Sequence, residues 1–253
     1  MNDRGIHTTR GGSSSIECKI LLGEVHVWLI PLDTPGESEP VAYHMLSADE
    51  MARADRFRFE RDRKRFTMAR AAMRAILARY VGTDPRRVAF DCGEHGKPEL
   101  VTVPNASELK FNFSHSSGLA LLGVTRRVPL GIDIEAVRGD FAAEEIAHSF
   151  FSADEVRRLL ELPEGQRTEA FFCCWTMKEA YVKALGQGLA IPLDSFSVAF
   201  QLNNPAALLR AETDANGVNR WTFYDIRVHP AYKAALVVEG KDHEIHQFEW
   251  TGF

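Results

Sequence analysis

The sequence is poor in cysteine and lacks both long apolar runs and the common nucleotide-binding signatures. Four cysteines in 253 residues are too few for a disulfide scaffold. No stretch approaches 18 consecutive apolar residues, so we expect no membrane-spanning segment. Neither a Walker A sequence nor G-x-G-x-x-G occurs, which argues against an ordinary P-loop or Rossmann enzyme.

The composition is that of a folded and mildly acidic protein. Hydrophobic residues make up 45% of the chain and charged residues 26%, and the formal net charge is −5. These values exclude wholesale disorder and argue against a dedicated nucleic-acid binder. Residues 1–15 are polar and rich in glycine and serine, without the apolar core of a signal peptide. We therefore expect a flexible leader at 1–15 and a reduced, cytoplasmic protein.

Apolar spacing predicts a mixture of strands and helices. A helix is expected to begin at Ser47, because Ser-x-x-Glu is a capping box, and to continue with a break to a stop at Gly82. Further helices are predicted over 142–151, from 152 onward and over 168–185. Strands are predicted over 23–30, 88–90, 109–113, 119–125, 130–135, 196–202, 220–228 and 234–239, the last two as a candidate hairpin.

Short segments recur between the two halves of the chain. Residues 66–74 resemble 175–183 at an offset of 109, Val-Ala-Phe recurs at an offset of 110, and 115–124 resemble 229–238 at an offset of 114. Each match alone is compatible with chance. Their common order favours a duplicated α+β unit, with subdomains at 16–127 and 128–253 and an active site in the cleft between them.

Two acidic residues alternate in the predicted strand Gly-Ile-Asp-Ile-Glu. Asp133 and Glu135 point to one face of such a strand, and Ile132 and Ile134 to the other. Like charges so close repel each other unless a cation lies between them or they face open water. A solvated edge strand is therefore the alternative to a cation site.

A third acid is carried by the predicted helix that ends near Gly186. Glu179 and Lys183 are four residues apart and share a helix face, and an exposed pair of this kind contributes only about 0.3–0.5 kcal/mol. The same helix carries aromatic residues that should bury it, and a buried pair needs further partners. If Glu179 joins Asp133 and Glu135, the oxygen ligands favour Mg²⁺.

Basic residues gather upstream of these acids. Between Arg53 and Arg79 there are ten Lys or Arg residues and three acids, which is either a solvated helix face or a field that attracts phosphates. Lys97 lies in a Gly-Lys-Pro turn, and Ser114 and His115 lie at the tip of a predicted strand. Cations that hold a polyanion beside a carboxylate–Mg²⁺ site are typical of phosphoryl-type transfer.

A second candidate metal motif lies near the end of the chain. His243-x-x-His246 has no apparent third ligand in the sequence and is weak evidence for a site.

The ordered motifs HGKP, FNFSHS, GIDIE, FFSADE and WTMKEAYVKALGQGL resemble those of the surfactin-type 4′-phosphopantetheinyl transferases. The resemblance runs from about residue 45 to 200. It implies two α+β subdomains in a pseudo-twofold arrangement. It also implies Mg²⁺-dependent transfer of phosphopantetheine from coenzyme A to a serine of an apo acyl or peptidyl carrier protein, with release of 3′,5′-ADP.

The resemblance also implies roles for single residues. Asp133, Glu135 and Glu179 correspond to Mg²⁺ ligands, Glu179 also to the general base, and Lys183 to the lysine that stabilises charge on the transferring phosphate. The positions expected to contact coenzyme A are Lys97, Ser114, His115, Arg65, Arg53 and Lys178.

The expected partners are coenzyme A and a carrier protein, without nucleic acid or membrane, and we expect a monomer because one chain supplies both halves of the cleft. Two alternatives remain open from the residues: a non-catalytic module that docks carriers through 53–79, and a Mg²⁺-dependent hydrolase of coenzyme A or another pyrophosphate.

Overall fold

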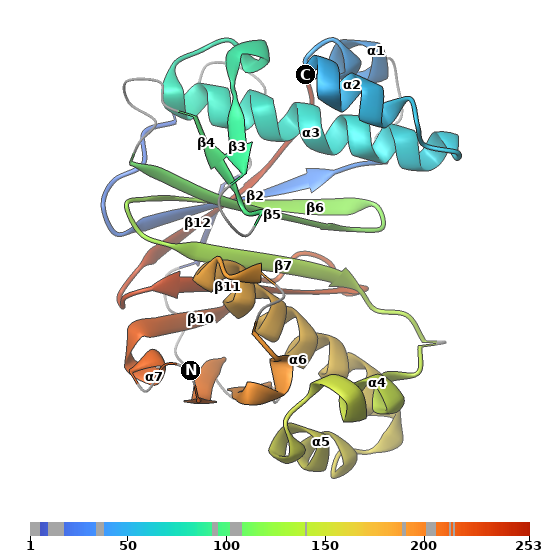
Figure 1. The fold of residues 1–253 in the computed structure, drawn as a ribbon, viewed down its shortest axis with the longest axis vertical. Coiled ribbons are helices and arrows are strands. Elements are labelled where there is room, and N and C mark those ends of the chain that lie inside the picture. Colours follow the sequence, from blue (N-terminus) through green and yellow to red (C-terminus); the bar gives the residue numbers. More distant parts are fainter. Residues whose placement is uncertain are drawn as a thin grey trace.

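Two sheets and two long helices form four stacked layers (Figure 1). The computed structural model describes residues 6–9, 18–33, 38–92, 96–101, 108–139, 141–188, 191–200, 206–212, 214 and 216–253. No helix in these ranges is long and apolar enough to cross a membrane. Helix α3 (Glu60–Val81) covers the outer face of one sheet, and helix α6 (Glu164–Leu185) covers the outer face of the other.

The larger sheet has five strands in the order β1, β12, β2, β6, β5. Their bounds are β1 (Ile6–Thr9), β12 (Glu244–Glu249), β2 (Glu24–Pro31), β6 (Leu119–Arg126) and β5 (Leu109–Ser116). The smaller sheet has the order β10 (Trp221–Asp225), β11 (Tyr232–Glu239), β7 (Leu130–Ala136). The β10–β11 pair is the predicted hairpin, which the antiparallel register confirms.

Shorter elements flank these layers. Helices α1 (Ser38–Tyr43) and α2 (Ala48–Ala54) lie beside α3, and α4 (Ala143–Phe150) and α5 (Ala153–Leu160) lie beside α6. The remaining elements are β3 (Phe90–Cys92) with β4 (Pro98–Leu100), β8 (Phe196–Ala199) with β9 (Ala207–Ala211), and α7 (Gly217–Arg220). The chain is α+β with two similar halves, as predicted.

The described residues form three apolar cores between the four layers. One joins α3 to the five-stranded sheet, one joins α6 to the three-stranded sheet, and the third fills the space between the two sheets. Ile132 and Ile134 belong to the core between the sheets. Because side chains alternate along a strand, Asp133 and Glu135 are directed away from that core.

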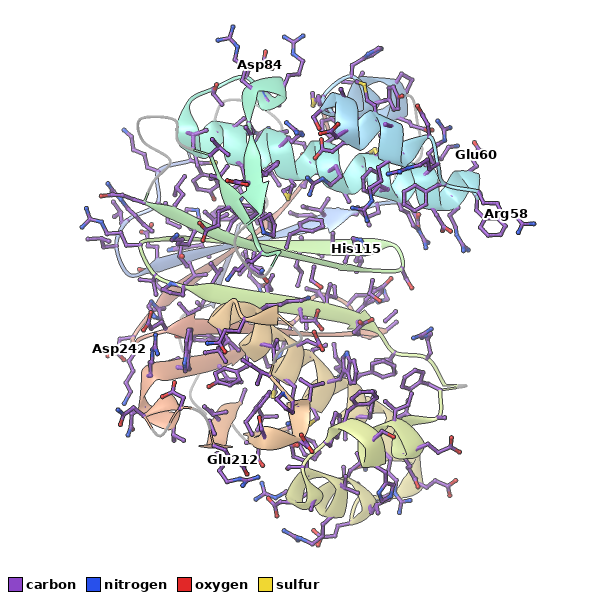
Figure 2. The ribbon with its side chains drawn as sticks, in the orientation of Figure 1. Arg58, Glu60, Asp84, His115, Glu212 and Asp242 are labelled. Carbon is purple, nitrogen blue, oxygen red and sulfur yellow. The ribbon has the colours of Figure 1, made fainter. Side chains whose placement is uncertain are left out.

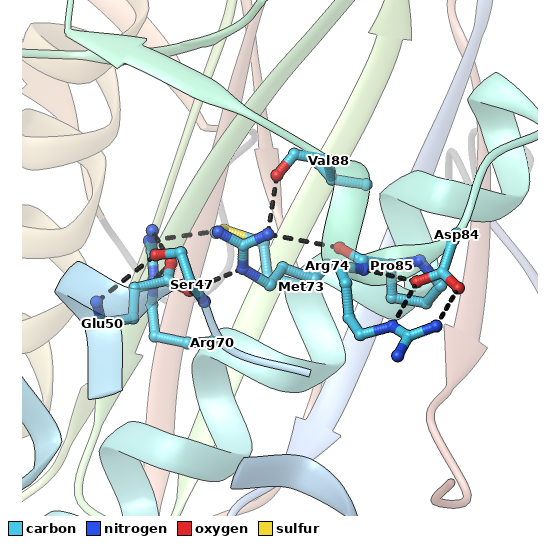
Figure 3. Close-up of polar contacts among 9 residues, drawn as sticks. Ser47, Glu50, Arg70, Met73, Arg74, Asp84, Pro85 and Val88 are labelled. Atoms are coloured by element: carbon cyan, nitrogen blue, oxygen red, sulfur yellow. Dashed lines mark hydrogen bonds and ion pairs between the residues drawn. The ribbon is translucent and has the colours of Figure 1, made fainter. Parts of the chain in front are cut away.

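The two halves repeat one polar device as well as the order of their elements. Glu50, the third residue of α2 and the acid of its capping box, accepts a hydrogen bond from Arg74 of α3 with an Oε2–Nε distance of 2.6 Å, and Arg74 donates to the carbonyl oxygen of Val88 at 2.6 Å (Figure 3). In the second half Glu155, again in a capping box, binds Lys178 of α6, which donates to the carbonyl of Phe196.

The spacing of this device fixes the alignment of the repeat. Glu155 follows Glu50 by 105 residues and Lys178 follows Arg74 by 104. Helices α3 and α6 each have 22 residues and each end at a glycine in the left-handed region, Gly82 and Gly186. These contacts support the duplication. The predicted helix offset of 109 is five residues too long, because it aligned similar residue types within the helices and not the helix ends.

Several element bounds differ from prediction. Strand β5 continues to Ser116, so Ser114–Ser116 are strand residues and the turn is confined to Ser117 and Gly118. The strand predicted over 88–90 lies at 90–92, and the helix predicted from 168 begins at Glu164. Strand β12 was not predicted. It pairs in parallel with β2, so the larger sheet takes a strand from beyond residue 128, where the second subdomain was expected to begin.

Candidate active site

The candidate site lies where the edge strand of one sheet meets the edge strand of the other. Strand β5 closes the larger sheet and β7 closes the smaller one. Their backbones are joined by side chains: Asn112 accepts a hydrogen bond from the Ile132 backbone N–H at 2.8 Å, and Ser116 accepts one from Ala136 at 3.1 Å. These bonds pair backbone donors at the β7 edge and fix the two strands side by side.

Gly131 allows helix α6 to pack directly on β7. A Cβ atom at this position would lie 2.0 Å from the carbonyl oxygen of Ala180 and 2.4 Å from the backbone nitrogen of Ala184. Both distances are far below van der Waals contact, so only glycine fits. The close approach brings the helix positions next to these alanines, Glu179 and Lys183, towards Asp133.

Asp133 is the most buried acid of the site and is held by two donors. Its Oδ1 accepts a hydrogen bond from the Ser114 hydroxyl at 2.7 Å and an ion-paired bond from the Lys183 ammonium at 2.6 Å. Lys183 also donates to Ser114 at 3.0 Å. The other carboxylate oxygen, Oδ2, is buried and has no hydrogen-bond partner. Strand β5, strand β7 and helix α6 therefore each supply one member of this triangle.

Glu135 is held by the next serine along β5. The Ser116 hydroxyl donates to Oε2 of Glu135 at 2.6 Å. Because residues two apart point to the same side of a strand, Ser114 and Ser116 meet Asp133 and Glu135 in the same order. The sequence did not predict Asn112 or Ser116 as site residues: Asn112 lies inside the predicted strand 109–113 but had no indicated partner, and Ser116 lies in the turn that was expected to follow that strand. Asn112, Ser114 and Ser116 alternate with aromatic residues, and this alternation indicates a strand that continues to Ser116.

Burial and mutual repulsion act on the two glutamates of the site. Burial raises the pKa of Glu135, and the Asp133 charge raises it further, while the Ser116 hydrogen bond lowers it. Burial likewise raises the pKa of Glu179, with added repulsion from Asp133 and Glu135. Carboxylates in this state favour a bound cation.

The three acids offer the kind of ligands that Mg²⁺ prefers, although their carboxylates are farther apart than the ligands of one bound ion. A buried Asp133 oxygen without a partner, together with two glutamates of raised pKa, supplies hard oxygen ligands only. Among the described residues, three ligand atoms lie within 4.8 Å of one another at Glu24, Glu244 and His246, and not at these acids. Oδ1 of Asp133 is instead paired with the Lys183 ammonium.

The predicted coenzyme A contacts fall into different surroundings. Lys97 donates to the carbonyl oxygens of Leu130 at 2.9 Å and Lys183 at 2.7 Å, so two of its three N–H groups are used. Burial lowers the pKa of Lys97 to about 8. The lysine borders a pocket of about 280 Å³ that is also lined by Pro98, Leu109, Phe111, Leu185 and Gly186.

His115 and the arginines lie at the rim of the β5–β6 hairpin or beyond it. His115 is exposed on β5 (Figure 2), next to the Phe113 ring. Arg65 binds both carboxylate oxygens of Asp33, at 2.7 and 2.5 Å, and this arginine lowers the pKa of Asp33. The Arg53 guanidinium is 5.1 Å from the ring centre of Phe66.

The structure corrects the prediction for Lys178. Its side chain is 0% exposed, and its ammonium lies 2.8 Å from Glu155, 2.8 Å from the Leu193 carbonyl and 2.7 Å from the Phe196 carbonyl. All three N–H groups are thus used inside the core of the second half. Lys178 stabilises α6 from within and does not contact coenzyme A. Residues one apart on a helix face different directions, which is why its motif neighbour Glu179 lies at the site and Lys178 does not.

Comparison with known proteins matches both halves of the chain. The 4′-phosphopantetheinyl transferase superfamily model matches residues 129–237, and the model described as 4′-phosphopantetheinyl transferase, N-terminal, matches residues 35–126.

Among curated proteins, the chain is 39% identical to the 4′-phosphopantetheinyl transferase HetI of Nostoc sp., covering 87% of this chain and 90% of that protein. It is 32% identical to Sfp of Bacillus subtilis strain 168, covering 85% of this chain and 93% of Sfp. It is also 32% identical to psf-1 of Bacillus pumilus, covering 83% of this chain and 87% of psf-1. Both latter proteins are likewise described as 4′-phosphopantetheinyl transferases.

Proposed function

Because the chain belongs to the 4′-phosphopantetheinyl transferase superfamily, we propose that it transfers phosphopantetheine from coenzyme A to a serine of an apo acyl or peptidyl carrier protein. The observation that carries this proposal is the acid site at the β5–β7 junction. There a buried oxygen of Asp133 without a partner lies near two glutamates of raised pKa. A site of this charge suits a diphosphate that binds together with a divalent cation.

Asp133, Glu135 and Glu179 are the residues that would hold Mg²⁺, with Ser114 and Ser116 orienting two of the three acids. The ion, when bound, neutralises charge on the diphosphate of coenzyme A.

In the proposed transfer, the carrier serine oxygen forms a bond to the phosphorus that bears pantetheine. The bond from that phosphorus to the bridging oxygen breaks, and 3′,5′-ADP leaves. Glu179 accepts the serine proton, and its raised pKa makes the carboxylate a stronger base than an exposed glutamate. Lys183 uses two N–H groups on Asp133 and Ser114, so the third is available to the leaving phosphate.

Basic and hydroxyl groups around the site would hold the nucleotide phosphates of coenzyme A. We assign this role to Lys97, Ser114, His115 and Arg65, with Arg53 further out. Lys97 has one N–H to offer, and Arg65 must share its guanidinium with Asp33 or leave it. The pocket beside Lys97 offers an apolar wall for part of the cofactor.

The proposal is tested by weighing apo carriers after incubation with the protein, Mg²⁺ and coenzyme A. A panel should include fatty-acid, polyketide and nonribosomal-peptide carriers. We expect at least one to gain the mass of a phosphopantetheinyl group, and Glu179→Gln to abolish the gain. Glu164→Gln, an exposed acid at the start of the same helix, is the matched control and should retain it. No gain on any carrier that a known transferase modifies would refute the proposal.

The same samples separate the alternatives. A hydrolase would release 3′,5′-ADP from coenzyme A without any carrier present. A docking module would bind carriers with an affinity that is independent of coenzyme A and Mg²⁺. We also propose that the protein acts as a monomer, since β5, β7 and α6 of one chain complete the site.

A further inference from the structure

A second group of candidate metal ligands lies on the opposite face of the larger sheet. Strands β2 and β12 run parallel, with Glu24 opposite Glu244 and His26 opposite His246. Residues two apart share a face, so these four side chains are on one side of the sheet. That side packs on α3, as the neighbouring Trp28 shows, whereas the active-site serines of β5 point to the other side.

Three ligand atoms of this group lie close together, and the separation between Glu244 and His246 matches that of two ligands of one ion. The Nε2 of His246 is 3.4 Å from Oε1 of Glu244 and 4.0 Å from Oε1 of Glu24, and all three donors lie within 4.8 Å of one another. Both N···O separations are within the range of an ion pair. Two donors bound tetrahedrally to one zinc ion at the usual bond lengths are about 3.4 Å apart.

Other groups hold Glu24 in place for this role. Its second oxygen, Oε2, accepts a hydrogen bond from the Leu21 backbone N–H at 2.8 Å and faces Nε2 of His26 at 3.5 Å. His26 is in turn anchored through Nδ1 to the Tyr80 hydroxyl at 2.7 Å. Oriented supporting partners of this kind are typical of metal ligands. They direct Oε1 of Glu24 towards His246.

Charge and access point the same way. Two glutamates opposite each other on adjacent strands repel, and a dication between them removes that repulsion. The side chains of Glu24 and His246 are 19% and 23% exposed, whereas that of Glu244 is 55% exposed. An ion can therefore enter over Glu244 and reach two largely buried ligands.

We propose that Glu24, Glu244 and His246 form a binding site for a divalent transition ion that fastens β12 to β2. The imidazole distinguishes this site from the all-oxygen acid site, and it favours zinc-like ions over Mg²⁺. Of the two histidines in the His243-x-x-His246 motif, only one contributes, and the other two ligands come from Glu24 and Glu244. His246 belongs to the site, while His243 donates to the Glu239 carbonyl at 2.9 Å and does not.

The test is thermal unfolding and calorimetry of the full chain with Zn²⁺, in excess Mg²⁺ so that the acid site is occupied. We expect one zinc ion per chain and a rise of at least about 5 °C in the unfolding midpoint when zinc exceeds its dissociation constant about 100-fold. Glu244→Gln and His246→Gln should each lose most of the rise, and the control His243→Gln should keep it. Because Glu244 is exposed, its variant remains informative if the His246 variant folds poorly.

Two results would overturn the proposal. One is an unmodified protein whose unfolding midpoint zinc does not raise. The other is an equal rise in all variants. A Co²⁺-loaded sample gives an independent reading: a thiolate charge-transfer band would place the ion at a cysteine and reject this site, whereas nitrogen and oxygen ligation alone supports it.

Discussion

Replacing Gly131 with alanine tests how the fold positions Glu179 and Lys183. The added Cβ would lie 2.0 Å from the Ala180 carbonyl oxygen, whereas real Cβ atoms essentially never approach closer than 3.0 Å. Since the obstacle is backbone on both sides, α6 must move away from β7 by about 1 Å. Overpacking of this kind costs about 1–3 kcal/mol in the free energy of unfolding. A displacement of about 1 Å at catalytic groups lowers the rate about 100-fold.

The assay is the initial rate of carrier modification together with denaturant unfolding. Gly139→Ala is the matched control, because a Cβ at that position meets no atom within 4 Å. We expect Gly131→Ala to lose about two orders of magnitude in rate while remaining folded, and Gly139→Ala to behave like the unmodified protein. A Gly131→Ala protein with a rate within threefold of the control would refute the view that this contact sets the position of Glu179 and Lys183.

Three further predictions follow from the site and its supports. The pKa values of Glu135 and Glu179 are raised, so protons compete with Mg²⁺ at these residues at a higher pH than at exposed glutamates. The Mg²⁺ concentration that gives half-maximal rate should therefore rise as the pH falls. A concentration that stays constant from neutral to mildly acidic pH would contradict this prediction. Ser116→Ala removes the hydrogen bond to Glu135 and should raise that concentration about tenfold with little change in kcat, whereas Ser116→Thr should restore it. Lys178→Met leaves its buried carboxylate partner unpaired and should cost about 3–5 kcal/mol in denaturant unfolding; Lys64→Met, which breaks an exposed pair, should cost less than about 1 kcal/mol, and equal losses would be inconsistent with the burial of Lys178.

The sequence signals for the candidate acid site are local, so they predict which side chains share a face. Alternation in a short strand places Asp133 and Glu135 on one side, and helical spacing places Glu179 and Lys183 on one face. The packing of these two faces against each other is a feature of the tertiary structure. It depends on Gly131, and no periodic pattern in the sequence indicates the role of this glycine.

Strand β12 and the placement of Lys178 could not be predicted from the sequence, for physical reasons. Strand β12 has only two apolar residues among Glu244–Glu249, so it shows no strong alternation, although it is a central strand of the larger sheet. Lys178 and Glu179 are adjacent residues of one motif, yet Lys178 lies in the core and Glu179 lies at the candidate site. The direction of a side chain around a helix decides this, and it is set by packing against Glu155.

The central claim is that Asp133, Glu135 and Glu179 bind the ion that phosphopantetheine transfer requires. The most direct measurement is calorimetric binding of Mg²⁺ in the presence of coenzyme A, paired with the carrier mass assay, for the unmodified protein and Asp133→Asn. We predict that the variant stays folded, loses Mg²⁺ binding at this site and leaves carriers unmodified. An Asp133→Asn protein that binds Mg²⁺ normally and modifies carriers at an undiminished rate would contradict the account.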